Sequence, residues 1–247
     1  MTAEFDARTA EQRRVWDEKP TLRLIYADFH RRLEAACPPG RLLDIGGSAH
    51  FKDYRPDVVS LDILHFPGID VVADAHHLPF ADGVFAGIVM LDVLHHLQRP
   101  VVFLAEAARV LATGGRLAMI EPGMSRIARH VYSRFHHEPV DMRADPFAVD
   151  RRQSGDDPWD SNQAIATLMF GSSERIARVE AAVPSLKVVS AEWLSLLAYP
   201  LSGGFQRWSL MPRRLTAPML AIEERLRHAV GTTLGFRQMV VIEKRRV

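Results

Sequence analysis

An apolar strand that carries an acid and turns through two glycines constrains this chain more than any other feature. The run Leu42–Ile45 contains Asp44, and Gly46 and Gly47 follow it directly. An apolar run bounded by glycines is typical of a buried parallel strand that enters a tight loop. Glycine adopts positive φ and leaves room for a ligand beside the backbone. The sequence therefore predicts a ligand-binding loop at the carboxyl end of a parallel sheet.

Carboxylates also follow two neighbouring apolar runs. Asp62 comes after Val58–Leu61, and Asp74 comes after Val71–Ala73. A pyrophosphate site would favour backbone N–H groups and often a lysine, but the turn from residue 44 to residue 50 contains neither Lys nor Arg. The acids therefore indicate a ligand that offers hydroxyls, amines and positive charge.

Further apolar runs complete the pattern of a sheet with helices between its strands. Strands are expected at Val84–Leu91 and Leu117–Ile120, with a helix at Val101–Ala112 that begins at Pro100 and is capped by Gly114. The alternation predicts right-handed crossovers and a doubly wound sheet, whose ligands bind at the carboxyl ends of the strands. The connections 51–56 and 63–68 are too short for full crossover helices, so we expect about one helical turn in the first and a loop in the second.

Two C-terminal elements are also predicted. A helix capped by Thr216 and ended by Gly231 carries one apolar face, formed by Leu215, Met219, Ile222, Leu226 and Val230. Phe236–Glu243 has the composition of a last buried strand.

In this order, the motifs resemble those of the class I S-adenosylmethionine-dependent methyltransferases, with a type 11-like domain at about residues 41–122. The resemblance rests on the acid-glycine turn, on Asp62, on Asp74-Ala75, on the run Leu78–Phe85 and on the run Glu106–Leu117. It implies an α/β, Rossmann-like, mostly parallel seven-stranded sheet. Its last strand would be antiparallel, and helices would be added at the N-terminus and after the fifth strand.

The resemblance implies S-adenosylmethionine as cofactor. Asp62 matches the acid that holds the ribose hydroxyls, and Asp74-Ala75 match the pair beside the adenine. The full set expected to bind the cofactor is Asp44, Gly46, Gly47, Ser48, His50, Asp62, Ile63, Asp74, Ala75, Leu91 and Asp92. The family's loop usually carries three glycines at alternate positions; this chain keeps Gly46 but has Ser48 and His50 in the other two slots.

Methyl transfer mainly requires that the acceptor and the methyl group are held in line, and a base is needed only if the acceptor carries a proton of high pKa. His96, after the fourth strand, and His137, beside Glu138, are the candidate catalytic bases. A purely structural role is the alternative for both. No recognised metal-ligand spacing is present, so no metal site is expected.

Three segments are distinguished: an N-terminal helical cap at 1–40, the methyltransferase domain at 41–247, and within it a lid and substrate insertion at 124–185. The insertion contains His137, Trp159 and Asn162 outside any periodic core pattern. A solvated loop is the alternative to a lid.

Composition limits location and partners. The formal charge of +1 gives no global field for nucleic acid, although residues 201–247 hold nine Lys/Arg against three Asp/Glu. The single cysteine, the absence of a signal peptide and the absence of a long apolar run predict a soluble cytoplasmic protein. The aromatic segment 193–215 indicates either peripheral membrane contact or a plain core or homodimer surface.

The leading hypothesis is an enzyme that transfers a methyl group to a small-molecule, lipid-linked or glycan-linked acceptor, with oxygen as the expected target. One alternative is a cofactor-binding module of the same fold without transferase activity. An NAD-type oxidoreductase is a further alternative, but Asp44 beside a pyrophosphate and a single fingerprint glycine argue against it.

Overall fold

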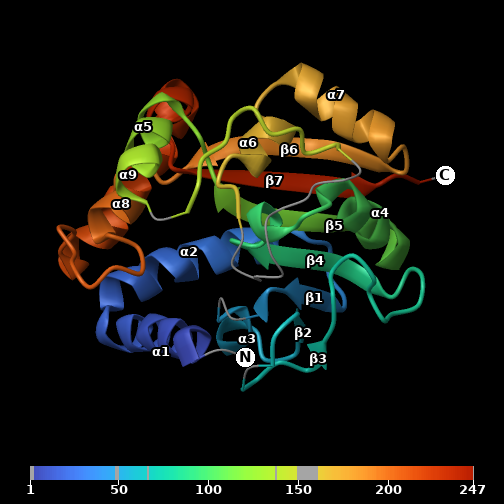
Figure 1. The fold of residues 1–247 in the computed structure, drawn as a ribbon, viewed down its shortest axis with the longest axis horizontal. Coiled ribbons are helices and arrows are strands. Elements are labelled where there is room, and N and C mark those ends of the chain that lie inside the picture. The colour runs from blue at the N-terminus through green and yellow to red at the C-terminus, as the bar shows by residue number, and fades with distance from the viewer. Residues whose placement is uncertain (1–2, 48–49, 66, 137, 149–160, 247) are drawn as a thin grey trace.

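The computed structural model describes residues 3–47, 50–65, 67–136, 138–148 and 161–246. These residues form a seven-stranded sheet in the order β3-β2-β1-β4-β5-β7-β6, which runs from the bottom to the top of Figure 1. The strands are β1 (Leu42–Ile45), β2 (Val59–Asp62), β3 (Val71–Val72), β4 (Phe85–Leu91), β5 (Leu111–Pro122), β6 (Leu186–Leu194) and β7 (Arg237–Lys244). The first five strands are parallel, and β7 runs antiparallel between β5 and β6. The predicted fold class is confirmed.

The helices are α1 (Ala3–Glu18), α2 (Pro20–Ala36), α3 (Phe51–Tyr54), α4 (Pro100–Val110), α5 (Arg126–Phe135), α6 (Ile165–Phe170), α7 (Ser173–Ala182), α8 (Ala198–Ser202) and α9 (Arg213–Leu234), with a 3₁₀ turn η2 at Leu94–His96. The short connections behave as predicted. Helix α3 is a single turn, and no helix lies between β2 and β3 in the described part of that connection.

Apolar side chains alternate between the two faces of the sheet, because successive residues of a strand point to opposite sides. In β4, Ile88 and Met90 join a core covered by α4, α6 and α7. Val89 and Leu91 join a second core, to which α2, α8 and α9 contribute. The site at the strand ends therefore lies on a sheet that is packed on both faces.

The transition from α4 to β5 differs from the prediction. The helix ends at Val110, and Leu111 already pairs with Phe85, whereas the next aligned pair is Gly87 with Arg116. Gly114, with a φ of 76°, lies in this irregular part of β5 and does not cap the helix.

Helix α9 also differs from the prediction. Thr216 lies inside the helix, because Pro212 is the N-cap residue and the helix continues past Gly231 to Leu234. Gly231 is needed for packing, since a Cβ there would lie 2.5 Å from the Cβ of Trp193.

The predicted apolar face of α9 is half exposed. Leu215, Ile222 and Leu226 are each 47% exposed, whereas Thr216 and Glu223 are buried. The carboxylate of Glu223 accepts hydrogen bonds from the backbone at the start of α8, and this contact turns the polar face inward. An amphipathic helix usually buries its apolar face, and α9 departs from this pattern because of a tertiary contact.

Helices α5, α8 and α9 lie together at one end of the sheet, at the left of Figure 1. β7 begins at this end, with Arg237 paired to Pro122 at the end of β5. The parallel strands therefore direct their carboxyl ends toward these helices. Among the described residues, none of the helices combines the length and apolarity that a membrane crossing needs.

Candidate active site

The loop after β1 is held by the neighbouring strand and by the turn after β4. Gly46 has a φ of 77°, and its N–H donates to the carbonyl of Leu61 at 2.8 Å. A Cβ on Gly46 would overlap Val93, and one on Gly47 would overlap Ser60. The space beside both glycines is thus occupied by protein side chains. In the structure these glycines permit close packing of two loops, a role that differs from the expected direct approach of a ligand.

Two carboxylates meet at the ends of β1 and β2. Asp44 is 2% exposed, and its Oδ2 has no hydrogen-bond partner among the described residues. Burial and then the nearby charge of Asp62 raise the pKa of Asp44 to about 7. Burial likewise raises the pKa of Asp62 to about 6, although Asp62 accepts a hydrogen bond from the N–H of Leu64. The pair is therefore poor in positive charge and in donors.

The remaining predicted cofactor residues divide by exposure. Ile63 follows Asp62 and is 55% exposed, so an apolar side chain lies open beside the carboxylate. Ala75 and Leu91 are buried. Asp74 accepts hydrogen bonds from both the backbone N–H and the ring of His76. Ser48 lies outside the described residues.

His50 is held in place by the N-terminal helices. It takes the left-handed conformation, with a φ of 62°, at the start of α3, and its Nδ1 lies 3.0 Å from Asp53. Its ring stacks on Trp16 of α1 with centroids 4.0 Å apart and planes 5° apart. The first helix therefore covers the loop after β1 by direct contact.

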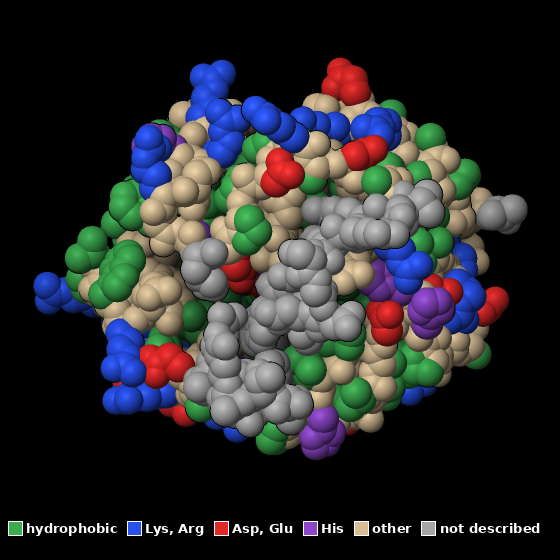
Figure 2. All heavy atoms as spheres, viewed as in Figure 1, with side chains coloured by type: hydrophobic (Ala, Val, Ile, Leu, Met, Phe, Trp, Pro, Cys, Tyr) green, Lys and Arg blue, Asp and Glu red, His purple; other side chains and the backbone are tan. Residues whose placement is uncertain are grey.

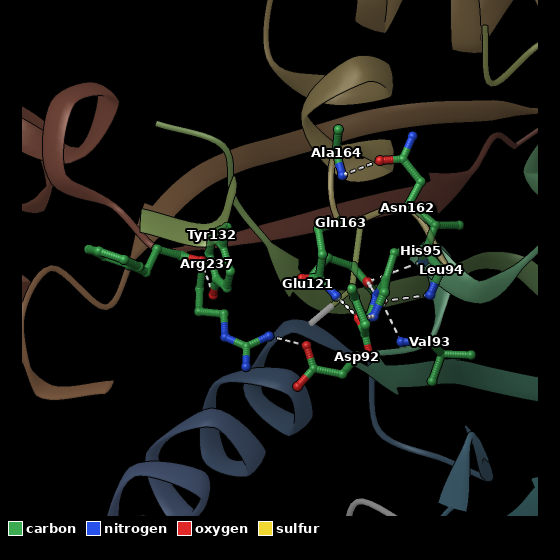
Figure 3. Close-up of polar contacts among 12 residues, drawn as sticks. Asp92, Val93, Leu94, His95, Glu121, Tyr132, Asn162, Gln163, Ala164 and Arg237 are labelled. Carbon is green, nitrogen blue, oxygen red and sulfur yellow. Dashed lines mark hydrogen bonds and ion pairs between the residues drawn. The ribbon is translucent and has the colours of Figure 1, made fainter. Parts of the chain in front are cut away.

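A buried Glu–His pair organises the turn after β4, as Figure 3 shows. Glu121, fully buried at the end of β5, accepts the backbone N–H groups of Val93 and Leu94 at 2.8 and 2.7 Å. Its other oxygen lies 2.7 Å from His95 Nδ1. The carboxylate thus caps η2 and fixes the orientation of an imidazole that is 3% exposed.

A second carboxylate faces the same imidazole. Glu138 lies 3.6 Å from His95 Nε2 and accepts a hydrogen bond from Gln163. Burial alone would lower the pKa of His95, but Glu121 and then Glu138 raise it to about 10. Burial would raise the pKa of Glu138, but His95 lowers it to about 2. Both carboxylates therefore favour the protonated form of His95, which makes it poorly suited to act as a base.

Of the two predicted catalytic bases, the structure describes His96 but not His137. His96 lies beside His95, with ring centroids 4.1 Å apart, and is partly exposed. His137 lies outside the described residues, as does the stretch 149–160 of the predicted lid. The lid therefore stays a prediction. Within the same insertion, α6 is fully buried and contributes Ile165, Met169 and Phe170 to the main core.

An Arg–Asp pair with tyrosines around it lies at the other side of the turn (Figure 3). Asp92 ends β4 in the left-handed conformation, with a φ of 60°, and forms an ion pair with Arg237, which is 3% exposed. The guanidinium lies 4.1 Å from the ring centroid of Tyr199, and Tyr26 Oη lies 3.4 Å from Asp92 Oδ2. Arg237 Nε has no hydrogen-bond partner among the described residues.

The sequence analysis missed Glu121, Glu138 and Arg237 as site residues. Glu121 could have been predicted from the sequence, because it lies at the end of a predicted strand as Asp44 and Asp62 do. Arg237 and Glu138 carried none, since an antiparallel strand and a loop bring them to the site from distant parts of the chain.

Among the described residues, two groups of side chains could hold a metal ion by proximity. In each of them the possible ligand atoms lie within 4.8 Å of one another; the groups are His95, His96 and Glu138, and Asp92, His95 and Glu121. His95 already bonds Glu121 through Nδ1 and faces Glu138 through Nε2. The expectation that the protein uses no metal stays a prediction.

Comparison with known proteins agrees with this geometry. Residues 41–119 match the family model described as a methyltransferase domain. A probable tRNA methyltransferase 9B of Bos taurus is 33% identical over 103 residues, which cover 39% of this chain and 22% of that protein. The malonyl-[acyl-carrier protein] O-methyltransferase of Geobacter sulfurreducens is 30% identical over 136 residues, with 47% and 48% covered. The chain thus spans less than half the length of these curated relatives.

The fold is shared over nearly the whole chain. The crystal structure of a SAM-dependent methyltransferase from Thermotoga maritima, described as a possible histamine N-methyltransferase, aligns with 92% of each chain at a TM-score of 0.56 and 17% identity. The sheet order, the acid-glycine turn and the matched segment 41–119 lead to one conclusion. Residues 41–119 match a methyltransferase domain, and the chain has the fold of an S-adenosylmethionine-dependent methyltransferase.

Proposed function

We propose that the protein transfers the methyl group of S-adenosylmethionine to an oxygen of a small-molecule or carrier-linked acceptor. The observation that carries the proposal is the pair of buried carboxylates, Asp44 and Asp62, at adjacent strand ends. The raised pKa values of both groups and the unpartnered oxygen of Asp44 suit a ligand that supplies hydroxyls and positive charge. S-adenosylmethionine has a ribose diol, an ammonium group and a sulfonium, so the residues present fit it.

In this proposal Asp62 accepts the ribose hydroxyls, and the open side chain of Ile63 packs against the adenine. The unpartnered oxygen of Asp44 faces the part of the cofactor that lies beside the loop after β1. When bound, S-adenosylmethionine supplies a methyl group that is activated by the positive charge of its sulfur. The protein's main contribution is then to hold the acceptor in line and to exclude water.

The acceptor side is assigned to the groups around Asp92. The Asp92 carboxylate offers an acceptor for a hydroxyl, and its contacts with Tyr26 and Arg237 hold it in place. The neighbouring His96 is the proposed base, because His95 is held as a cation. The name of the Geobacter relative, an O-methyltransferase, supports oxygen as the target.

The partner proposal uses the segment 193–215. Its exposed apolar side chains, Leu197, Trp208, Leu210 and Leu215, lie beside Arg207, Arg213 and Arg214. Aromatic and aliphatic side chains next to arginines are typical of a surface that rests on anionic lipid. We propose peripheral contact with lipid as the role of this surface, and a homodimer contact is the competing outcome.

Calorimetric titration with S-adenosylmethionine and with S-adenosylhomocysteine tests the cofactor proposal. We expect both to bind and NAD not to bind. Asp62→Ala should weaken binding by about 1.5–3 kcal/mol, which is typical of charge-assisted hydrogen bonds. Asp57→Ala is the matched control, since it also removes one carboxylate but at an exposed ion pair with Arg55.

Two results would contradict the proposal. Binding of NAD without binding of S-adenosylmethionine would remove the proposed cofactor. Equal affinities in the Asp62 and Asp57 variants would show that Asp62 does not contact the ribose. If the cofactor binds but no acceptor pool is methylated, the chain is a binding module of the same fold.

A further inference from the structure

A basic pocket lies beside the candidate active site, outside the residues used so far. It has a volume of about 420 Å³ and is formed by one side of α5 and the loop 140–143. Its charged lining consists of Arg126, Arg129, Arg134, Arg143 and Asp141. Figure 2 shows Lys or Arg side chains and a histidine gathered at the upper left of the view, where α5 and α9 lie in Figure 1. The chain as a whole has a formal charge of +1, so this concentration of positive charge is local.

Of the four arginines in the lining, Arg134 contacts the ring of His130. Arg126, Arg129 and Arg143 are exposed, and their guanidinium groups form no ion pair with another described residue. Asp141 is engaged by the backbone N–H of Arg143. Four guanidinium groups against one carboxylate leave an excess of positive charge, and Ser133 adds a hydroxyl. Guanidinium groups match the oxygens of phosphate in charge and in geometry.

Hydrogen bonds connect the pocket wall to the histidine turn. The N–H of Asp141 donates to Asn162 Oδ1, and Asn162 Nδ2 donates to the carbonyl of Asp141, both at 2.9 Å. The N–H of Asn162 donates to the carbonyl of His95, also at 2.9 Å. The same loop carries Glu138, which faces His95. A ligand seated in the pocket would therefore rest against a wall that is continuous with the site of methyl transfer.

We propose that this pocket binds a phosphate group of the methyl acceptor, so that the acceptor is a phosphate ester or diphosphate. The assignment of the phosphate to a methyl acceptor rests on the proposed function, but binding of an anion in the pocket can be tested without it. One helix and one short loop form the pocket, and its volume suits one or two phosphate groups. A nucleic acid would instead require a basic track for several phosphates along the backbone.

The test is calorimetric titration of the full chain with inorganic pyrophosphate, with acetate as the reference anion. We expect pyrophosphate to bind much more tightly than acetate, and Arg129→Ala and Arg143→Ala each to weaken it by about tenfold or more. Arg13→Ala is the matched control, because it removes an equally exposed arginine from α1, outside the pocket lining. Thermal unfolding of each variant verifies that it is folded.

A second measurement connects the pocket to the acceptor. A metabolite extract is methylated with labelled S-adenosylmethionine before and after treatment with phosphatase, and labelled product should be lost after the treatment. Pyrophosphate that binds no better than acetate, or equally in all variants, would overturn the anion site. Binding of tRNA that depends on Arg129 without binding of pyrophosphate would also overturn it. If S-adenosylmethionine fails to bind while pyrophosphate binds as expected, the proposed function fails and the anion site stands.

Discussion

The first prediction concerns the contribution of the Glu121–His95 pair to the free energy of unfolding. Measurements at two pH values distinguish the part due to the charge on His95 from the part due to packing. Glu121→Gln keeps the shape of the side chain but replaces one acceptor oxygen with an amide donor. Two of the four N–H groups that face Glu121 then lose their acceptor, and His95 loses the anion that keeps it charged. Breaking a buried ion pair by changing one partner costs about 3–5 kcal/mol. We expect a loss of this size in the free energy of unfolding at pH 7.

The pH dependence identifies the cause of that loss. The folded pKa of His95 is about 10 against 6.5 in the unfolded chain, so its stabilisation is fully present below pH 6.5 and disappears as pH rises through 10. Between pH 7 and pH 9.5 this group alone should cost the wild type about 3 kcal/mol. The Gln variant has little of this contribution to lose. The difference in stability between the two proteins should therefore shrink by about 3 kcal/mol over the same interval.

Urea unfolding followed by circular dichroism at pH 7 and pH 9.5 measures this difference. Glu243→Gln is the matched control, since Glu243 pairs with Arg116 on the neighbouring strand but about a third of its side chain is exposed. That change should cost less than about 1 kcal/mol at either pH. A difference for Glu121→Gln that is equal at both pH values would refute the reasoning, because it would mean that His95 is neutral in the folded protein.

Two further predictions concern the loop 203–211. Lys19, buried with its pKa lowered to about 8, donates to the carbonyls of Gly204, Gln206 and Trp208 at 2.7–2.9 Å, so Lys19→Met should lower the unfolding free energy by about 2–4 kcal/mol in urea titrations. An unchanged midpoint would show that the loop does not depend on this anchor. The double change of Trp208 and Leu210 to Ser should abolish sedimentation with vesicles that contain anionic lipid, without changing the affinity for S-adenosylmethionine. Loss of a dimer in place of vesicle binding would assign the surface to self-association.

The sheet was predictable because its signals are local. Each buried strand is an apolar run that a turn or a glycine ends, and the short connection at Phe51–Tyr54 limited α3 to one turn. The ends of α4 and α9 were not predictable. Leu111 leaves the helix because it pairs with Phe85. Gly231 does not end α9, and Trp193 packs in the space that a side chain at Gly231 would occupy. Both are tertiary contacts that no single segment contains.

The candidate site divides in the same way. Strand-end acids could be placed from the sequence, because parallel strands bring their carboxyl ends to one edge. The state of the histidine turn could not be predicted. His95 faces Glu121 from another strand and Glu138 from an inserted loop, and only these two contacts reveal that its protonated form is favoured.

The contact between Gly46 and Val93 has a consequence for communication within the enzyme. Gly46 belongs to the loop assigned to the cofactor, and Val93 is the residue whose N–H is held by Glu121 at the start of the histidine turn. Because the side chain of Val93 packs directly against the backbone of Gly46, a shift of the first loop would press on the second. If the cofactor binds at the first loop as proposed, this contact would carry its arrival to the histidine turn by direct steric pressure.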